Sequence, residues 1–157
     1  MPGLRTQRLR LRPLTVDEAR AVRAGVPLVD ARFAEGYPLP DTYDGLGLFM
    51  RHGDERWGFS LVVRDEDGPV IGEIGFVGPP AEGAVMIGYA IVPSARRRGY
   101  ATEAIVAISD WALAQHEVGE VRAQTLPDNE ASIRALLRAG FEETAGNGKL
   151  RRFRRVD

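Results

Sequence analysis

Apolar and polar residues alternate along several stretches of this chain, and each stretch predicts a β-strand. Residues 6–14 place leucines on one face and arginines on the other, and Pro13 ends the pattern. Residues 57–63 alternate in the same way, and the strand signal resumes over residues 69–77 after an Asp-Gly pair. Because such a pair supplies the positive φ that a tight turn needs, the two stretches are predicted to form a hairpin. Residues 84–92 and 121–126 are two further predicted strands.

A helical period replaces this alternation in three places. Thr15 and Glu18 have the spacing of a capping box and predict a short helix directly after them. Asp128 or Asn129 can cap another helix, which Gly140 would end. The longest predicted helix has an apolar stripe at helical spacing, formed by Ala101, Ala104, Ile105, Ile108 and Ala112.

The order of these elements favours an α+β fold, with a mixed sheet and helices on both faces. Residues 25–50 follow neither period because glycines and prolines interrupt them, and we expect a loop with one or two short helices there. Residues 141–144 and 149–156 are predicted to form a closing hairpin around an Asn-Gly turn. With 157 residues and no repeats or linkers, the chain is expected to form a single domain spanning residues 1–157.

Composition narrows the functional class. The 21 basic and 22 acidic residues give a formal net charge of −1, which does not favour a nucleic acid or a membrane surface as partner. The basic run over residues 149–155 is interpreted as a charged edge strand that blocks association between sheets. The absence of cysteine excludes a disulfide framework, a cysteine-based zinc site and a cysteine nucleophile. His52 and His116 are far apart in sequence and do not form a metal-binding pair, so no metal is expected.

The N-terminal region carries arginines but no apolar segment typical of a signal peptide, and no apolar run is long enough to cross a membrane. We therefore expect a soluble, cytoplasmic protein, present as a monomer or a homodimer.

One segment, residues 87–104, points to anion binding. A buried strand ends at Pro93, three arginines and Gly99 form a turn, and a helix begins directly after it. A helix N-terminus offers unpaired N–H groups and about half a positive charge. Gly99 would let a phosphate approach the backbone closely, and the arginines add forked hydrogen-bond donors. The alternative is a plain strand–helix connection whose arginines are merely solvated.

The same segment resembles a known family. Arg96-x-x-Gly99-x-Ala101 matches the Arg/Gln-x-x-Gly-x-Gly/Ala signature of the GNAT superfamily of N-acetyltransferases. Three more elements are similar to the RimJ/RimL branch of that superfamily: residues 6–14, which look like its first strand; residues 99–104; and Asn129-Glu130-Ala131-Ser132 followed by Gly140-Phe141. The resemblance runs from about residue 6 to residue 144 and leaves residues 25–55 unmatched.

The resemblance implies a mixed, mostly antiparallel sheet of six or seven strands and acetyl-CoA as acetyl donor. It also implies direct transfer of the acetyl group to a primary amine within a ternary complex. By the family's pattern, the backbone of Ile91 and Val92 would pair with the pantetheine arm, and an amide there would hold the thioester oxygen. Asn129 would anchor pantetheine or an ordered water, and Ser132 would lie beside the cofactor, although both residues could simply cap a helix. The pyrophosphate would be bound by the turn formed by Arg96, Arg97, Arg98, Gly99, Tyr100, Ala101 and Thr102.

Both catalysts common in the family are missing from their usual places. The strand before the signature reads Val-Met-Ile over residues 85–87 where many members have a glutamate, and Leu136 stands where many have a tyrosine. Glu73 on the preceding strand is the alternative candidate for the general base, directly or through water, although a solvent-facing glutamate fits equally well. The RimJ/RimL resemblance suggests Ser132 as the acid, with water as the alternative, and Tyr89 is interpreted as a packing residue.

The acceptor is open: a protein N-terminus, a polyamine, an amino acid or an antibiotic would each supply a primary amine. Residues 15–50 are mildly acidic, which either attracts a cationic amine or only reflects solvated helix faces. A non-catalytic CoA-binding or sensor module is the alternative function, because both usual catalysts are missing.

Overall fold

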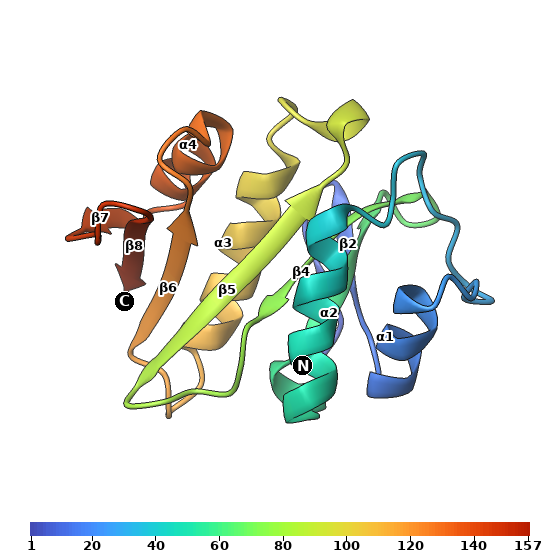
Figure 1. Cartoon of the computed structure of the whole chain (residues 1–157), viewed down its shortest axis with the longest axis horizontal. Coiled ribbons are helices and arrows are strands. Elements are labelled where there is room, and N and C mark those ends of the chain that lie inside the picture. The colour runs from blue at the N-terminus through green and yellow to red at the C-terminus, as the bar shows by residue number, and fades with distance from the viewer.

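A twisted sheet of eight strands runs through the molecule, and the computed structural model describes all 157 residues around it (Figure 1). Its spatial order is β1-β2-β3-β4-β5-β6-β8-β7, and every neighbouring pair is antiparallel except β5 and β6. The strands are β1 (Leu4–Arg5), β2 (Leu9–Pro13), β3 (Phe59–Arg64), β4 (Val70–Phe76), β5 (Ala84–Ile91), β6 (Glu120–Thr125), β7 (Glu142–Thr144) and β8 (Arg151–Val156).

Four α-helices and two 3₁₀ turns cover the sheet: α1 (Val16–Arg23), α2 (Pro40–His52), α3 (Tyr100–Leu113), α4 (Glu130–Arg138), η1 (Glu55–Trp57) and η2 (Pro93–Ala95). Side chains on β4 show that α2 and α3 lie on opposite faces. Glu73 bonds to Thr42 of α2, whereas Phe76, which points the other way, packs against Trp111 of α3 (Figure 1). None of the helices is long and apolar enough to cross a membrane.

The predicted α+β architecture is confirmed, but the sheet has eight strands rather than six or seven. The first predicted strand, residues 6–14, divides into β1 and β2 because the chain turns at Thr6, whose hydroxyl accepts from Leu9 N. The closing hairpin predicted over residues 141–144 and 149–156 is confirmed as β7 and β8, and β7 forms the other edge of the sheet.

The basic C-terminal strand is not an edge strand, so that interpretation is wrong. β8 lies between β6 and β7, and its arginines face acidic partners on β7: Arg151 binds Glu143 at 2.6 Å and Arg154 binds Glu142 at 2.9 Å. The basic residues of β8 therefore pair with acidic residues of β7, the strand that precedes β8 in the sequence and forms a hairpin with it.

Helix α2 is a 13-residue helix in a stretch for which only short helices were expected. Gly45 and Gly47 lower its intrinsic helix propensity, but tertiary packing overrides that cost. A Cβ at Gly45 would lie 3.2 Å from the Phe59 ring, so the glycine lets the helix approach β3 closely. Pro40 begins the helix, and Gly53 ends it in the left-handed conformation.

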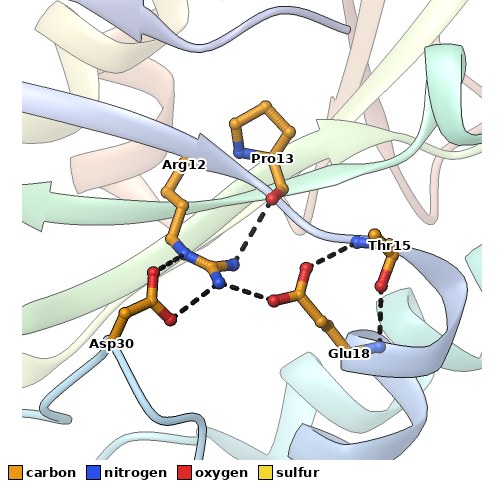
Figure 2. Close-up of polar contacts among 5 residues, drawn as sticks. All are labelled: Arg12, Pro13, Thr15, Glu18 and Asp30. Atoms are coloured by element: carbon orange, nitrogen blue, oxygen red, sulfur yellow. Dashed lines mark hydrogen bonds and ion pairs between the residues drawn. The ribbon is translucent and has the colours of Figure 1, made fainter.

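An ion network ties β2, α1 and the segment between α1 and α2 together, and Figure 2 shows Arg12 at its centre. The guanidinium binds both oxygens of Asp30 at 2.8 Å and Glu18 at 2.5 Å, while only 14% of the Arg12 side chain is exposed. These bonds lower the pKa of the Glu18 and Asp30 carboxyls. Glu18 also completes the predicted capping box with Thr15, which is confirmed (Figure 2). The network bonds Asp30, within residues 25–39, to β2.

Gly75 of β4 lies so close to Phe59 that a larger residue there should destabilise the protein. A Cβ at Gly75 would lie 2.4 Å from Cγ of Phe59 and 2.6 Å from the Gly58 carbonyl oxygen. We expect Gly75→Ala to lower the free energy of unfolding by about 1–3 kcal/mol, measured by urea denaturation. Gly78→Ala is the control, because its Cβ would meet nothing within 4 Å. Equal stability of the two variants would contradict the packing described for β3 and β4.

Candidate functional site

Strands β5 and β6 pair only at their beginnings. The parallel register covers Ala84–Met86 of β5 against Glu120–Arg122 of β6, and the strands then diverge toward their carboxyl ends (Figure 1). On β5, Met86 O accepts from Val77 N, and just after the strand Val92 N donates to Ile71 O. The backbone N–H and C=O groups of the even-numbered residues of β5 therefore point toward β4. The backbone groups of Ile87, Tyr89 and Ile91 consequently face the side on which β5 has no strand partner.

This geometry separates Ile91 from Val92, which were predicted to act together. The N–H of Val92 is bonded to Ile71 O at 2.8 Å, and its carbonyl accepts from Ala95 N at 3.0 Å. The carbonyl of Ile91 accepts from Arg96 Nε at 2.8 Å, which leaves the Ile91 N–H facing the open edge. The amides of Tyr89 and Ile91, rather than that of Val92, are the groups that can bond an extended ligand here.

The turn after η2 is built to expose backbone N–H groups. Arg97 and Gly99 both adopt positive φ, at 62° and 81°, and Gly99 begins α3 without a side-chain cap. Such a turn forms a concave nest of N–H groups in front of the positive end of a 14-residue helix. Arg96, Arg97 and Arg98 are all exposed, and the guanidinium of Arg96 also reaches back to the end of β5.

Arg8 of the β1–β2 turn supports this nest from the other side, a role that sequence reasoning missed. Its Nη1 donates to the Arg98 carbonyl at 2.8 Å, its guanidinium lies 4.5 Å from the Tyr100 ring centroid, and its Nε bonds Glu103 at 3.4 Å. A cavity of about 580 Å³ adjoins the turn and is lined in part by Arg8, Gly99 and Thr102. Only tertiary packing reveals this support, because the alternation of residues 6–14 shows Arg8 merely as a polar strand residue.

The N-terminus of α4 reaches across the diverging strands. Asn129 caps α4 by accepting from Ser132 N at 3.2 Å, so the capping interpretation holds for this residue. The hydroxyl of Ser132 lies 2.5 Å from the hydroxyl of Tyr89 on β5. Burial raises the pKa of Tyr89 to about 12, against a smaller lowering by Ser132, so the phenol keeps its proton at neutral pH. Tyr89 is therefore hydrogen-bonded to a candidate site residue as well as packed.

Glu73 lies beneath α2 and is only 3% exposed, so the alternative of a solvent-facing glutamate is wrong. Thr42 donates to its Oε1 at 2.5 Å, and the Tyr37 hydroxyl faces the same carboxylate. Burial raises the pKa of Glu73 to about 7, while Thr42 and Tyr37 oppose the shift and the charge of Asp41 adds to it. A carboxyl group with this pKa can accept and return a proton near neutral pH, as a general base must.

The two candidate catalytic groups lie on opposite faces of β5. Glu73 pairs with Ala90 across β4 and β5, on the face covered by α2. Tyr89 pairs with Ile74 and points to the other face, where Ser132 meets it. A group held at the β5 edge would thus have a proton acceptor on one side and hydroxyl donors on the other.

Thr42, which donates to Glu73, and Tyr37, whose hydroxyl faces it, were missed because they lie within residues 25–50, whose pattern is unreadable. No group of His, Cys, Asp and Glu side chains in the structure could hold a metal ion.

Comparison with known proteins agrees with this geometry. The family described as "Acetyltransferase (GNAT) domain" matches residues 8–142. An uncharacterized N-acetyltransferase of Bacillus subtilis (strain 168), YjdG, is 30% identical over 158 aligned positions that cover 88% of each chain.

Solved structures share the fold over nearly the whole chain. An acetyltransferase from Agrobacterium tumefaciens str. C58 superposes with a TM-score of 0.70 at 27% identity, over 100% of this chain and 95% of that one. RimL, a ribosomal L7/L12 alpha-N-protein acetyltransferase solved with coenzyme A, has a TM-score of 0.67 over 99% of this chain and 98% of its own. Its 16% identity supports likeness of fold alone. With a family match over most of its length, this chain belongs to the GNAT acetyltransferase family.

Proposed function

We propose that this acetyltransferase takes its acetyl group from acetyl-CoA and transfers it directly to a primary amine in a ternary complex. The open edge of β5, which runs straight into the nest at the start of α3, is the observation that supports this most directly. An extended pantetheine arm can add to such an edge like a strand, and a pyrophosphate suits the N-terminus of a helix. RimL, which has the same fold, was solved in complex with coenzyme A.

The residues of the nest would divide the binding of acetyl-CoA between them. The backbone N–H groups of residues 97–102 would hold the pyrophosphate, with Arg97 and Arg98 adding charge. Arg96 would act by fixing the end of β5, because its guanidinium is already bonded to Ile91 O. The N–H groups of Tyr89 and Ile91 face the open edge, where one of them would hold the thioester oxygen and stabilise its developing charge.

Proton transfer would use groups on both faces of β5. Glu73 would accept the proton of the attacking amine, for which a pKa of about 7 suits it. The departing thiolate of CoA would take a proton from Ser132, and the Ser132 oxygen would take one from the Tyr89 hydroxyl through their hydrogen bond. The Tyr89 oxygen would regain its proton from solvent before the next turnover. Asn129 would act mainly by fixing the first turn of α4 that carries Ser132.

The acceptor we propose to test first is a protein N-terminal amine, because RimL is described as an alpha-N-protein acetyltransferase. Small amines are the second class. We also propose that residues 1–157 act as one acetyltransferase domain, since 35 buried residues form a single apolar cluster. A non-catalytic CoA-binding module remains the alternative function, and turnover of any amine would exclude it.

Binding of acetyl-CoA tests the position of the nest. We expect Gly99→Ala to weaken acetyl-CoA binding at least tenfold, about 1.4 kcal/mol, measured by calorimetric titration. The added Cβ would lie 3.2 Å from Arg8 Nη2, in a left-handed conformation that disfavours side chains. Gly53→Ala is the matched control, because Gly53 has a similar φ of 69° but ends α2 with nothing within 4 Å of its Cβ. Unchanged affinity in Gly99→Ala would place the pyrophosphate elsewhere.

Activity against pH tests Glu73. A base acts only when ionised, so the wild-type rate should rise with pH through about 7. We expect Glu73→Gln to lower kcat by roughly 100-fold, to abolish that rise and to leave acetyl-CoA affinity unchanged. Glu35→Gln, an exposed neutralisation in the neighbouring loop, should change neither. A Glu73→Gln enzyme with the wild-type pH profile would assign the base role to water.

Stability against pH provides a second readout for Glu73 that needs no acceptor. Its pKa is raised in the folded state from an ordinary value of 4.5 to about 7, so the folded protein binds more protons than the unfolded one between these pH values. This contribution to stability is fully present below pH 4.5 and is lost as the pH rises through 7. We expect Glu73→Gln to remove that loss, measured as the free energy of unfolding at several pH values.

A further inference from the structure

The Tyr37 hydroxyl is a buried polar group whose role the proposed reaction leaves open. Tyr37 is 7% exposed, and its ring packs edge-on against Phe33 with centroids 5.0 Å apart. The hydroxyl faces the Glu73 carboxylate, yet no protein group forms a hydrogen bond of good geometry with it. Burying a hydroxyl without a partner costs free energy, so such groups usually bind water or a ligand. A phenylalanine here would fill the same space without that cost.

The second oxygen of Glu73 is also without a protein partner. Thr42 donates to Oε1, and the Tyr37 hydroxyl faces the carboxylate without a hydrogen bond of good geometry to either oxygen. Oε2 is not among the buried, unpaired atoms of the protein, so it retains some contact with solvent. Because the whole residue is only 3% exposed, a molecule the size of water can reach this oxygen more readily than an amine on a substrate.

We propose that Tyr37 is a positioning residue of the active site, whose hydroxyl holds a water molecule between Glu73 Oε2 and the acceptor amine. This inference rests on the proposed acetyl transfer with Glu73 as base. As the amine nitrogen forms its bond to the acetyl carbon, the nitrogen releases a proton to the water oxygen. The water passes one of its own protons to Oε2, so the water is regenerated and Glu73 becomes neutral. The Tyr37 hydroxyl donates to the water oxygen throughout and keeps its own proton.

The surroundings of Tyr37 suit a donor that does not ionise. Burial, and then the negative charge of Glu73, raise the pKa of the phenol above its usual range. The other charged or titratable groups near the pair are Asp41 and Tyr43, both on α2. The neighbours of Glu73 across β3 and β5 are Leu61 and Ala90, which carry no charge.

The segment that carries Tyr37 is bonded to β4, and Tyr37 N donates to Ala34 O at 3.1 Å. Ala34 N donates to Val70 O and Val70 N donates to Arg32 O, so the preceding residues are joined to the start of β4. Asp30, a little earlier in the segment, is bound by Arg12 (Figure 2). These bonds join the segment that carries Tyr37 to the strand that carries Glu73.

Tyr37→Phe tests the inference, because it removes the hydroxyl and keeps the ring. The assay follows release of CoA from acetyl-CoA with three probes: a short peptide with a free N-terminal serine, spermidine and free lysine. We expect kcat to fall roughly ten- to hundredfold and the midpoint of the pH–rate rise to shift upward by about half a pH unit or more, since the variant loses the hydroxyl that holds this water against ionised Glu73. The KM for acetyl-CoA should not change. Tyr43→Phe, whose side chain on α2 is 38% exposed, should behave like the wild type.

Stability separates this role from a structural one. If the Tyr37 hydroxyl had no function, Tyr37→Phe would be at least as stable as the wild type and equally active, so activity is the readout that distinguishes the two cases. We expect at least wild-type stability together with the loss of activity. Unchanged kcat and an unchanged pH midpoint in Tyr37→Phe, with Glu73→Gln inactive, would overturn the role of Tyr37 and leave the proposed function standing.

Failure of the proposed function has a different signature, namely no turnover of any probe by the wild type. The inference is then decided by the pH dependence of the free energy of unfolding, which reports the ionisation of Glu73 directly. A higher midpoint in Tyr37→Phe than in the wild type would support a hydroxyl that favours ionised Glu73 through the water it holds. An identical midpoint would refute it.

Discussion

The loss of pairing between β5 and β6 after Met86 is the constraint on which the rest of the site depends. A strand inside a sheet normally has partners on both edges, and an unpaired backbone edge is costly unless something else bonds to it. Here Arg96 satisfies one carbonyl, and the contact between Tyr89 and Ser132 links β5 to α4. The remaining groups of the edge are left for a ligand, directly beside the N-terminus of α3.

The carboxyl group of Glu73, buried beneath α2, is a second feature that lowers the stability of the fold. Ionising Glu73 at neutral pH opposes folding, because burial raises its pKa to about 7. The residues beside it on both neighbouring strands, Leu61 and Ala90, are apolar, so the carboxylate gains no charged partner there. Groups whose burial costs stability are typical of functional sites, and the hydroxyls of Thr42 and Tyr37 around this one fit that interpretation.

Much of the fold could be predicted because its signals are local. Alternation located the strands at residues 57–63, 69–77 and 84–92, and the Thr15–Glu18 capping box located α1. The two candidate caps, Asp128 and Asn129, located the start of α4. The 25–50 segment could not be read because Gly45 and Gly47 signal a loop locally. Their absent side chains are what allow α2 to pack against the sheet, and only the packed structure shows that benefit.

The functional site also has parts that the sequence reveals and parts that only the tertiary structure reveals. The sequence by itself determined the Arg96–Thr102 turn and the family. A nest at a helix N-terminus is formed by consecutive residues, so a short sequence motif is enough to reveal it. The sequence also marked Glu73 as a candidate, but not its surroundings. Only the tertiary structure decided that Glu73 is buried, that Thr42 and Tyr37 face it, that Arg8 supports the nest and that Val92 is bonded to β4. Those contacts join residues distant in sequence, and a carboxylate takes its pKa from whatever the fold packs around it.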